Sequence, residues 1–151
     1  MTNPRQLGLF LALAMTGALL QGCESPKPPE AAKPGPRLFA ADVTGGAKAC
    51  TVPKVLPARG KPVDAAMTVG NDGGWCAITV TQPEGAPFDA GLLTAVPQHG
   101  KVLIHKVGDS TRIDYTPDPA FTGVDAFTVT LLPNDAVIRA TVTIAPAQTK
   151  P

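Results

Sequence analysis

Short runs of alternating apolar and polar residues, each ended by turn-forming residues, constrain the fold of this chain more than any other feature. A period of two places every second side chain on one face of a β-strand, whereas a helix repeats every ~3.6 residues. About seven such runs follow one another, at residues 65–69, 75–81, 92–96, 101–107, 111–116, 126–132 and 137–144. Strands of this length joined by turns at regular spacing predict an all-β sandwich.

The alternation also predicts the side chains that face the core. They are Ala65, Met67, Val69, Cys76, Ile78, Val80, Val102, Ile104, Ile113, Tyr115, Phe127, Val129, Leu131, Ile138, Ala140, Val142 and Ile144. Hairpin-type turns are predicted at residues 70–74 and 108–110, because glycine, asparagine and aspartate tolerate positive φ. Residues 133–135 form a third turn before the last run.

The first 22 residues have the layout of an export signal. Arg5 precedes an apolar run over residues 7–20, which is shorter than the ~20 residues that a membrane span needs. Leu20, Gly22 and Cys23 resemble the lipobox of bacterial lipoproteins, which implies cleavage after Gly22 and acylation of Cys23. The alternative is an ordinary signal peptide with a cysteine nearby.

The resemblance to lipoproteins implies where the protein is anchored. Acyl chains contribute ~0.8 kcal/mol per buried methylene group, so a multiply acylated Cys23 would hold the protein to a membrane durably. Glu24 follows the cysteine, whereas enterobacterial sorting uses aspartate there for inner-membrane retention. We therefore expect the periplasmic face of the outer membrane rather than the inner membrane.

Composition divides the remainder into a tether and one domain. Residues 24–37 are rich in proline and lack hydrophobic periodicity, which predicts a disordered, extended tether of ~3.1 Å per residue. The expected organisation is a signal peptide over 1–22, the lipidated cysteine and tether over 23–37, and a β-domain over 38–148. Without Arg5 the mature chain has 12 basic and 12 acidic residues. This balance argues against nucleic-acid binding, which needs a basic face.

Two cysteines remain besides Cys23. Cys50 and Cys76 form an even pair in a compartment that the export signal predicts to be oxidising, which favours a disulfide between them. The alternative is a reactive or metal-binding pair of thiols.

Aromatic, proline and glycine residues recur at fixed spacings in the C-terminal third. They are Pro97, Gly100, Val102, Tyr115, Pro117, Phe121, Gly123, Asp125, Phe127 and Val129. Over about residues 97–144 these spacings resemble the immunoglobulin-like and cadherin-like repeats of exported bacterial proteins. The resemblance implies a single immunoglobulin-like β-sandwich with a non-catalytic role in adhesion, assembly or display.

The chain has two histidines, and one of them is a candidate metal ligand. His99 precedes Gly100 and is predicted to be a turn residue. His105 faces outward beside Asp114 of the neighbouring strand, so it could bind zinc or copper with Asp114 or with Met67. An exposed cross-strand charge pair is the alternative interpretation.

Aspartates are the candidate ligands for calcium, which cadherin-like modules bind through oxygens. The motif D-x-N-D-N and the EF-hand loop are both absent from the sequence. Positions at turns and strand ends explain most of the candidates, which are Asp109, Asp114, Asp118, Asp125 and Asp135.

Neither a catalytic site nor a cofactor site is predicted. Ser25 falls in the tether, Ser110 falls in a turn, and no G-x-S-x-G motif is present. Trp75 lies on the opposite face from Cys76, so it either contacts a partner or a sugar, or packs under the loop 82–91. We therefore expect a lipid-anchored envelope protein whose non-catalytic domain binds an envelope protein or polysaccharide. Periplasmic metal handling is the alternative function.

Overall fold

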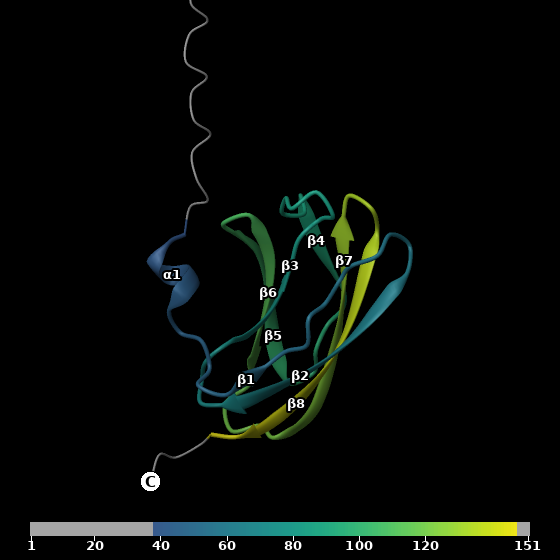
Figure 1. Ribbon diagram of the computed structural model, residues 1–151. Coiled ribbons are helices and arrows are strands. Elements are labelled where there is room, and N and C mark those ends of the chain that lie inside the picture. Colours follow the sequence, from purple (N-terminus) through teal and green to yellow (C-terminus); the bar gives the residue numbers. More distant parts are fainter. Residues whose placement is uncertain (1–37, 148–151) are drawn as a thin grey trace, which may run out of the picture. The chain divides into compact units, whose positions relative to one another are not determined.

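The alternating runs pair into two β-sheets in a computed structural model that describes residues 38–147. The predicted signal peptide (1–22), Cys23 and the tether (23–37) lie outside the described residues. Figure 1 shows the elements, which are α1 (Ala40–Val43), β1 (Cys50–Thr51), β2 (Pro62–Asn71), β3 (Cys76–Val80), β4 (Ala90–Ala95), β5 (Gly100–Val107), β6 (Ser110–Pro117), β7 (Gly123–Leu132) and β8 (Ala136–Pro146). The predicted all-β sandwich is confirmed.

One sheet has five strands in the order β1-β2-β8-β7-β4, and the other has three in the order β3-β6-β5. All neighbours are antiparallel except β2 and β8, which run parallel from the pair Pro62 and Val137 to the pair Asn71 and Pro146. The chain changes sheet four times, between β2 and β3, β3 and β4, β4 and β5, and β6 and β7.

The core lies between the two sheets and contains the side chains that the alternation predicts. Of the predicted inward residues, only Val102 and Ile104 on the edge strand β5 are partly buried; the others are buried. Tyr115 and Phe127 are the largest fully buried side chains, and their rings stack with centroids 5.8 Å apart. Aromatic pairs of this kind add to the free energy of burial, so this pair stabilises the centre of the domain.

The predicted turns at 108–110 and 133–135 are confirmed, since each joins two antiparallel neighbours. The predicted hairpin at 70–74 is wrong, because β2 and β3 belong to different sheets and this turn carries the chain between them. The Asp72 carboxylate accepts one hydrogen bond within this turn, from the backbone amide of Gly74, and another from the amide of Lys48 before β1. These two donors hold the pKa of Asp72 below its ordinary value. A turn composition thus predicts a reversal but not the partner of the next strand.

Two elements were not predicted. The strand β1 has two residues, too few for an alternation, and it brings the number of strands between residues 38 and 147 to eight instead of about seven. The helix α1 has four residues, too few to show a helical period. No helix within residues 38–147 is long and apolar enough to cross a membrane.

Candidate functional site

Residues 39–47, called here the N-terminal segment, pass over the outer face of the three-stranded sheet. In Figure 1 the helix α1 of this segment lies beside β6, on the side away from β2 and β8. The segment is attached by backbone hydrogen bonds of 2.8 Å from Ala47 N to Trp75 O and 3.1 Å from Trp75 N to Gly45 O. It therefore extends the edge at the start of β3 and covers polar side chains on β6.

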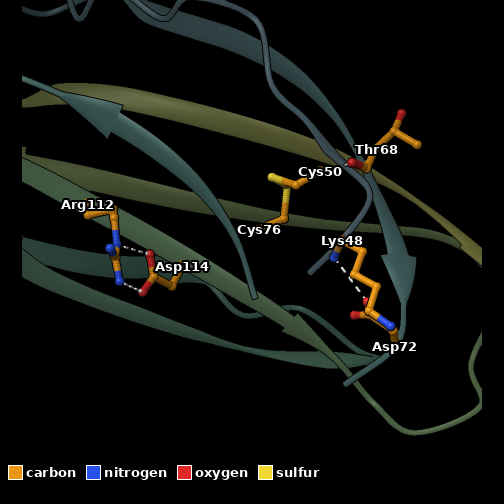
Figure 2. The surroundings of a disulfide bond; sticks show 7 residues. All are labelled: Lys48, Cys50, Thr68, Asp72, Cys76, Arg112 and Asp114. Carbon is orange, nitrogen blue, oxygen red and sulfur yellow. Dashed lines mark hydrogen bonds and ion pairs between the residues drawn. A yellow bond between two sulfur atoms is a disulfide. The ribbon is translucent and has the colours of Figure 1, made fainter. Parts of the chain in front are cut away.

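A buried ion pair lies under this segment. Arg112 and Asp114 are alternate residues of β6 and point outward, yet they are only 7% and 4% exposed. The guanidinium donates from Nε to Asp114 Oδ1 at 2.7 Å and from Nη2 to Oδ2 at 2.8 Å (Figure 2). Such a bidentate pair is a strong, directional contact. A further nitrogen, Nη1, donates to the carbonyl oxygen of Asp42 in α1.

His105 completes the cluster. Its Nε2 lies 3.0 Å from Asp114 Oδ2, and its Nδ1 lies 3.9 Å from Asp42 Oδ1. The structure thus places His105 beside Asp114, as expected. The expectation that both side chains are exposed is wrong for Asp114. The N-terminal segment covers that carboxylate, while the imidazole keeps 26% of its side-chain surface exposed.

Trp75 lies against the same cluster. The Arg112 guanidinium carbon is 4.0 Å from the centre of the indole ring, a cation–π contact. The indole Nε1 donates to the carbonyl of Thr44 at 3.0 Å, and the ring packs against Gly45 and Gly46. The expected packing of Trp75 under the loop 82–91 is therefore wrong, because the N-terminal segment covers this side chain instead. Sequence periodicity carries no information on this long-range contact.

The cluster is better suited to fixing the N-terminal segment than to binding a metal ion. Both oxygens of Asp114 already accept from Arg112, and Met67, the alternative to Asp114 as a ligand beside His105, is 1% exposed in the core. Within residues 38–147 no three His, Cys, Asp or Glu side chains are grouped as a metal site would require. Arg112 and Asp42 were missed by the sequence analysis, although the outward position of Arg112 beside Asp114 is visible in the alternation of β6.

The predicted disulfide between Cys50 and Cys76 is confirmed. The sulfur atoms are 2.05 Å apart, and the Cα atoms are 5.3 Å apart (Figure 2). Cys50 belongs to β1 in the five-stranded sheet and Cys76 to β3 in the other, so the bond joins the two layers.

The candidate calcium ligands are not gathered into one site. Asp114 belongs to the ion pair described above, and Asp109 and Asp135 lie in two different turns. The carboxylate of Asp125 is instead part of a buried hydrogen-bond network. It accepts from the backbone amides of Gln98 at 3.0 Å, His99 at 2.9 Å and Ala126 at 2.8 Å, and from the hydroxyl of Tyr115 at 2.9 Å.

This network determines the ionisation of two groups. Burial raises the pKa of the Tyr115 hydroxyl, and the adjacent Asp125 carboxylate raises it further. Burial also opposes ionisation of Asp125, but its four hydrogen-bond donors outweigh burial and hold its pKa below the ordinary value. The network fixes the bend before β5 to the start of β7, with the ring of His99 stacked on Phe121 at 3.9 Å.

We expect Asp125→Asn to lower the free energy of unfolding by about 2–3 kcal/mol at pH 7. An amide keeps one acceptor oxygen and turns a donor group toward the remaining donors, which leaves buried groups without partners. Because the pKa of folded Asp125 is depressed, its contribution is present above the unfolded-state pKa of about 3.9. The contribution is lost as the pH falls through the lower pKa of the folded state.

Urea unfolding at pH 7 and pH 3 checks this prediction. The difference between the parent protein and Asp125→Asn should shrink at pH 3, while Tyr115→Phe, which removes one donor only, should cost about 1 kcal/mol at pH 7. A difference that does not change with pH would contradict the assigned role of the carboxylate.

Comparison with known proteins identifies the domain. No curated protein matches the chain. A family model described as "Bacterial Ig domain" matches residues 57–145, which is more than half of the chain and reaches from before β2 into β8. The match extends the resemblance, which the sequence motifs limited to the C-terminal third, to the strands β2 and β3. This chain belongs to the bacterial Ig domain family.

Proposed function

We propose that this protein is a lipid-anchored component of the bacterial cell envelope whose Ig-like domain serves binding or assembly rather than catalysis. The disulfide Cys50–Cys76 is the observation that carries the proposal, because disulfides persist in oxidising compartments such as the periplasm. Export would be directed by the N-terminal signal, and acylated Cys23 would anchor the protein to the periplasmic face of the outer membrane. The partner would be an envelope protein or a polysaccharide.

The use of the polar side chains supports a non-catalytic role. Asp114 and Arg112 hold the N-terminal segment, and Asp125 holds the bend before β5. Among the described residues, no buried side-chain nitrogen or oxygen lacks a hydrogen-bond partner. A general base or nucleophile needs groups that are free to react with a substrate. Domains of this family are typically non-catalytic, and the described polar groups are used in the same structural manner.

The intact mass of the full chain from native membranes tests the proposal. We expect cleavage before Cys23, a mass increase that corresponds to acylation, and two thiols that react with iodoacetamide only after reduction. Cys23→Ala is the matched control and should lack the acyl mass while leaving the disulfide intact. An unmodified Cys23 would overturn the anchor, and freely reactive Cys50 and Cys76 would overturn the assignment to an oxidising compartment.

Metal handling is the second candidate function, and the contact of 3.0 Å between His105 Nε2 and Asp114 Oδ2 is the observation that favours it. Calorimetric titration of the full chain with zinc or copper separates the two functions. Metal handling requires saturable heat that His105→Asn abolishes and that the control His99→Asn retains. The Ig-like binding role predicts no saturable heat in any of the three proteins.

A further inference from the structure

The outer face of the five-stranded sheet carries an ordered array of short, uncharged side chains. One row across four strands consists of Thr51, Thr68, Thr143 and Val124, which are cross-strand neighbours in register. All four are exposed, and Thr68 points away from the disulfide and the core (Figure 2). We call the outward side of β1, β2, β8 and β7 the threonine face.

The next row of the threonine face has the same character. Ala66 of β2, Thr141 of β8 and Ala126 of β7 are adjacent and exposed. None of the strands of this sheet contains a lysine; the lysines within described strands are both in β5 of the other sheet. Exposed surfaces of soluble proteins normally carry many charged side chains of both signs, which limit association. The threonine face carries few of them.

One pair of opposite charges interrupts the array. Asp64 of β2 and Arg139 of β8 are direct neighbours in the parallel register, and both are exposed. Among the described residues neither takes part in an ion pair within 4.0 Å or in a side-chain hydrogen bond. Both charges therefore remain available to a partner.

We propose that the threonine face is the interface of a homodimer, in which two copies pack their five-stranded sheets face to face. A two-fold axis that runs along the strands between β2 and β8 exchanges the positions of these two strands. It places the partner's Asp64 over Arg139, and Arg139 over the partner's Asp64, so one pair of charges makes two intermolecular ion pairs. The same axis sets Thr68 opposite the partner's Thr143 and Ala66 opposite the partner's Thr141. Short side chains at these positions allow the close approach of ~10 Å that stacked sheets require.

The dimensions of the threonine face set the expected affinity. Three strands of about ten residues, spaced ~4.8 Å apart, together with the two-residue β1 cover roughly 500 Å² per copy. Two copies would bury about 1,000 Å², which is at the lower limit of specific interfaces. We therefore expect a dimer with a dissociation constant in the micromolar range. Because the axis runs along the strands, both domains point the same way, and, if the proposed anchor is correct, both tethers can reach one membrane.

Sedimentation equilibrium of the full chain in density-matched detergent tests the dimer, whether or not Cys23 carries lipid. We expect a reversible monomer–dimer equilibrium. Its dissociation constant should rise at least tenfold in Arg139→Glu and in Asp64→Arg. The double variant Asp64→Arg/Arg139→Glu exchanges the charges and should restore the affinity to within about threefold. Lys101→Glu makes the same change of charge on the other sheet and should leave the affinity unchanged.

The exchanged residues are exposed, so the thermal unfolding midpoint should not change when it is measured below the dissociation constant of the parent dimer, where dimerisation adds nothing to stability. That midpoint serves as the folding control. A parent protein that remains monomeric up to about 1 mM would overturn the proposal and leave the face to a different partner. Dimerisation that Arg139→Glu does not weaken would place the interface elsewhere.

Discussion

Replacing Cys50 and Cys76 together by alanine is expected to lower the free energy of unfolding by about 3–4 kcal/mol. The two residues are 26 positions apart, and the entropy of closing a loop of this length in the unfolded chain gives that magnitude. For a domain of this size the loss corresponds to a fall of roughly 10–25 °C in the midpoint of thermal unfolding. Few single changes should affect the domain as strongly.

The structure explains why other contacts are not expected to compensate. Cys50 lies in β1, which has two residues and pairs only with β2. Without the bond, β1 is linked to the opposite sheet indirectly, through the N-terminal segment and its contacts with Trp75 and Arg112. We expect the loss to appear also as faster backbone hydrogen exchange over residues 45–51 than over β7 and β8.

Thermal unfolding with and without dithiothreitol checks this expectation. Reductant should lower the midpoint of the parent protein to nearly that of Cys50→Ala/Cys76→Ala, and it should not affect the double variant. A double variant within about 1 kcal/mol of the parent would show that the sulfur atoms are not what joins the layers.

The core could be predicted from sequence because each strand carries its own signal. In β6 the alternation Arg112-Ile113-Asp114-Tyr115 assigns Ile113 and Tyr115 to the core, and both are fully buried. The same holds for β7 and β8, in which threonines alternate with buried apolar residues. A period of two is a local property, so one strand is enough to reveal which of its faces is buried.

The position of the N-terminal segment over the outer face of the three-stranded sheet could not be predicted, because it depends on contacts between residues far apart in sequence. Asp42 and Arg112 are 70 positions apart in sequence, and the helix that carries Asp42 is one turn long. The alternation therefore indicates a solvent-exposed Asp114, whereas the N-terminal segment buries it. The hairpin predicted at residues 70–74 failed for a related reason, since local turn chemistry does not select the partner strand.

The buried ion pair gives the second prediction. We expect Arg112→Met to lower the free energy of unfolding by about 3–5 kcal/mol, because it leaves the Asp114 carboxylate buried without its bidentate partner. Methionine retains much of the arginine's volume, so the loss reports the missing charge and hydrogen bonds more than a cavity. Arg59→Met, at an exposed arginine before β2 and outside the threonine face, is the matched control and should change the stability by no more than about 0.5 kcal/mol.

Fluorescence separates local release of the N-terminal segment from general destabilisation. Trp75 is the single tryptophan of the chain, and it lies between Arg112 and Gly45 and Gly46 of the segment. Loss of the guanidinium should let the segment open, so the emission of the folded variant should shift to longer wavelength before any unfolding. The parent protein should show the shift only on unfolding.

A double variant tests whether the pair serves stability or position. In Arg112→Met/Asp114→Leu the whole pair is replaced by apolar side chains, which often restores the stability that a single change removes. We expect most of the free energy to return while the red-shifted emission of Trp75 persists, because the donor to the Asp42 carbonyl is still missing. Recovery of both quantities would show that packing alone holds the N-terminal segment. Recovery of stability alone would identify Arg112 as the residue that positions the segment through which the domain continues toward the N-terminus.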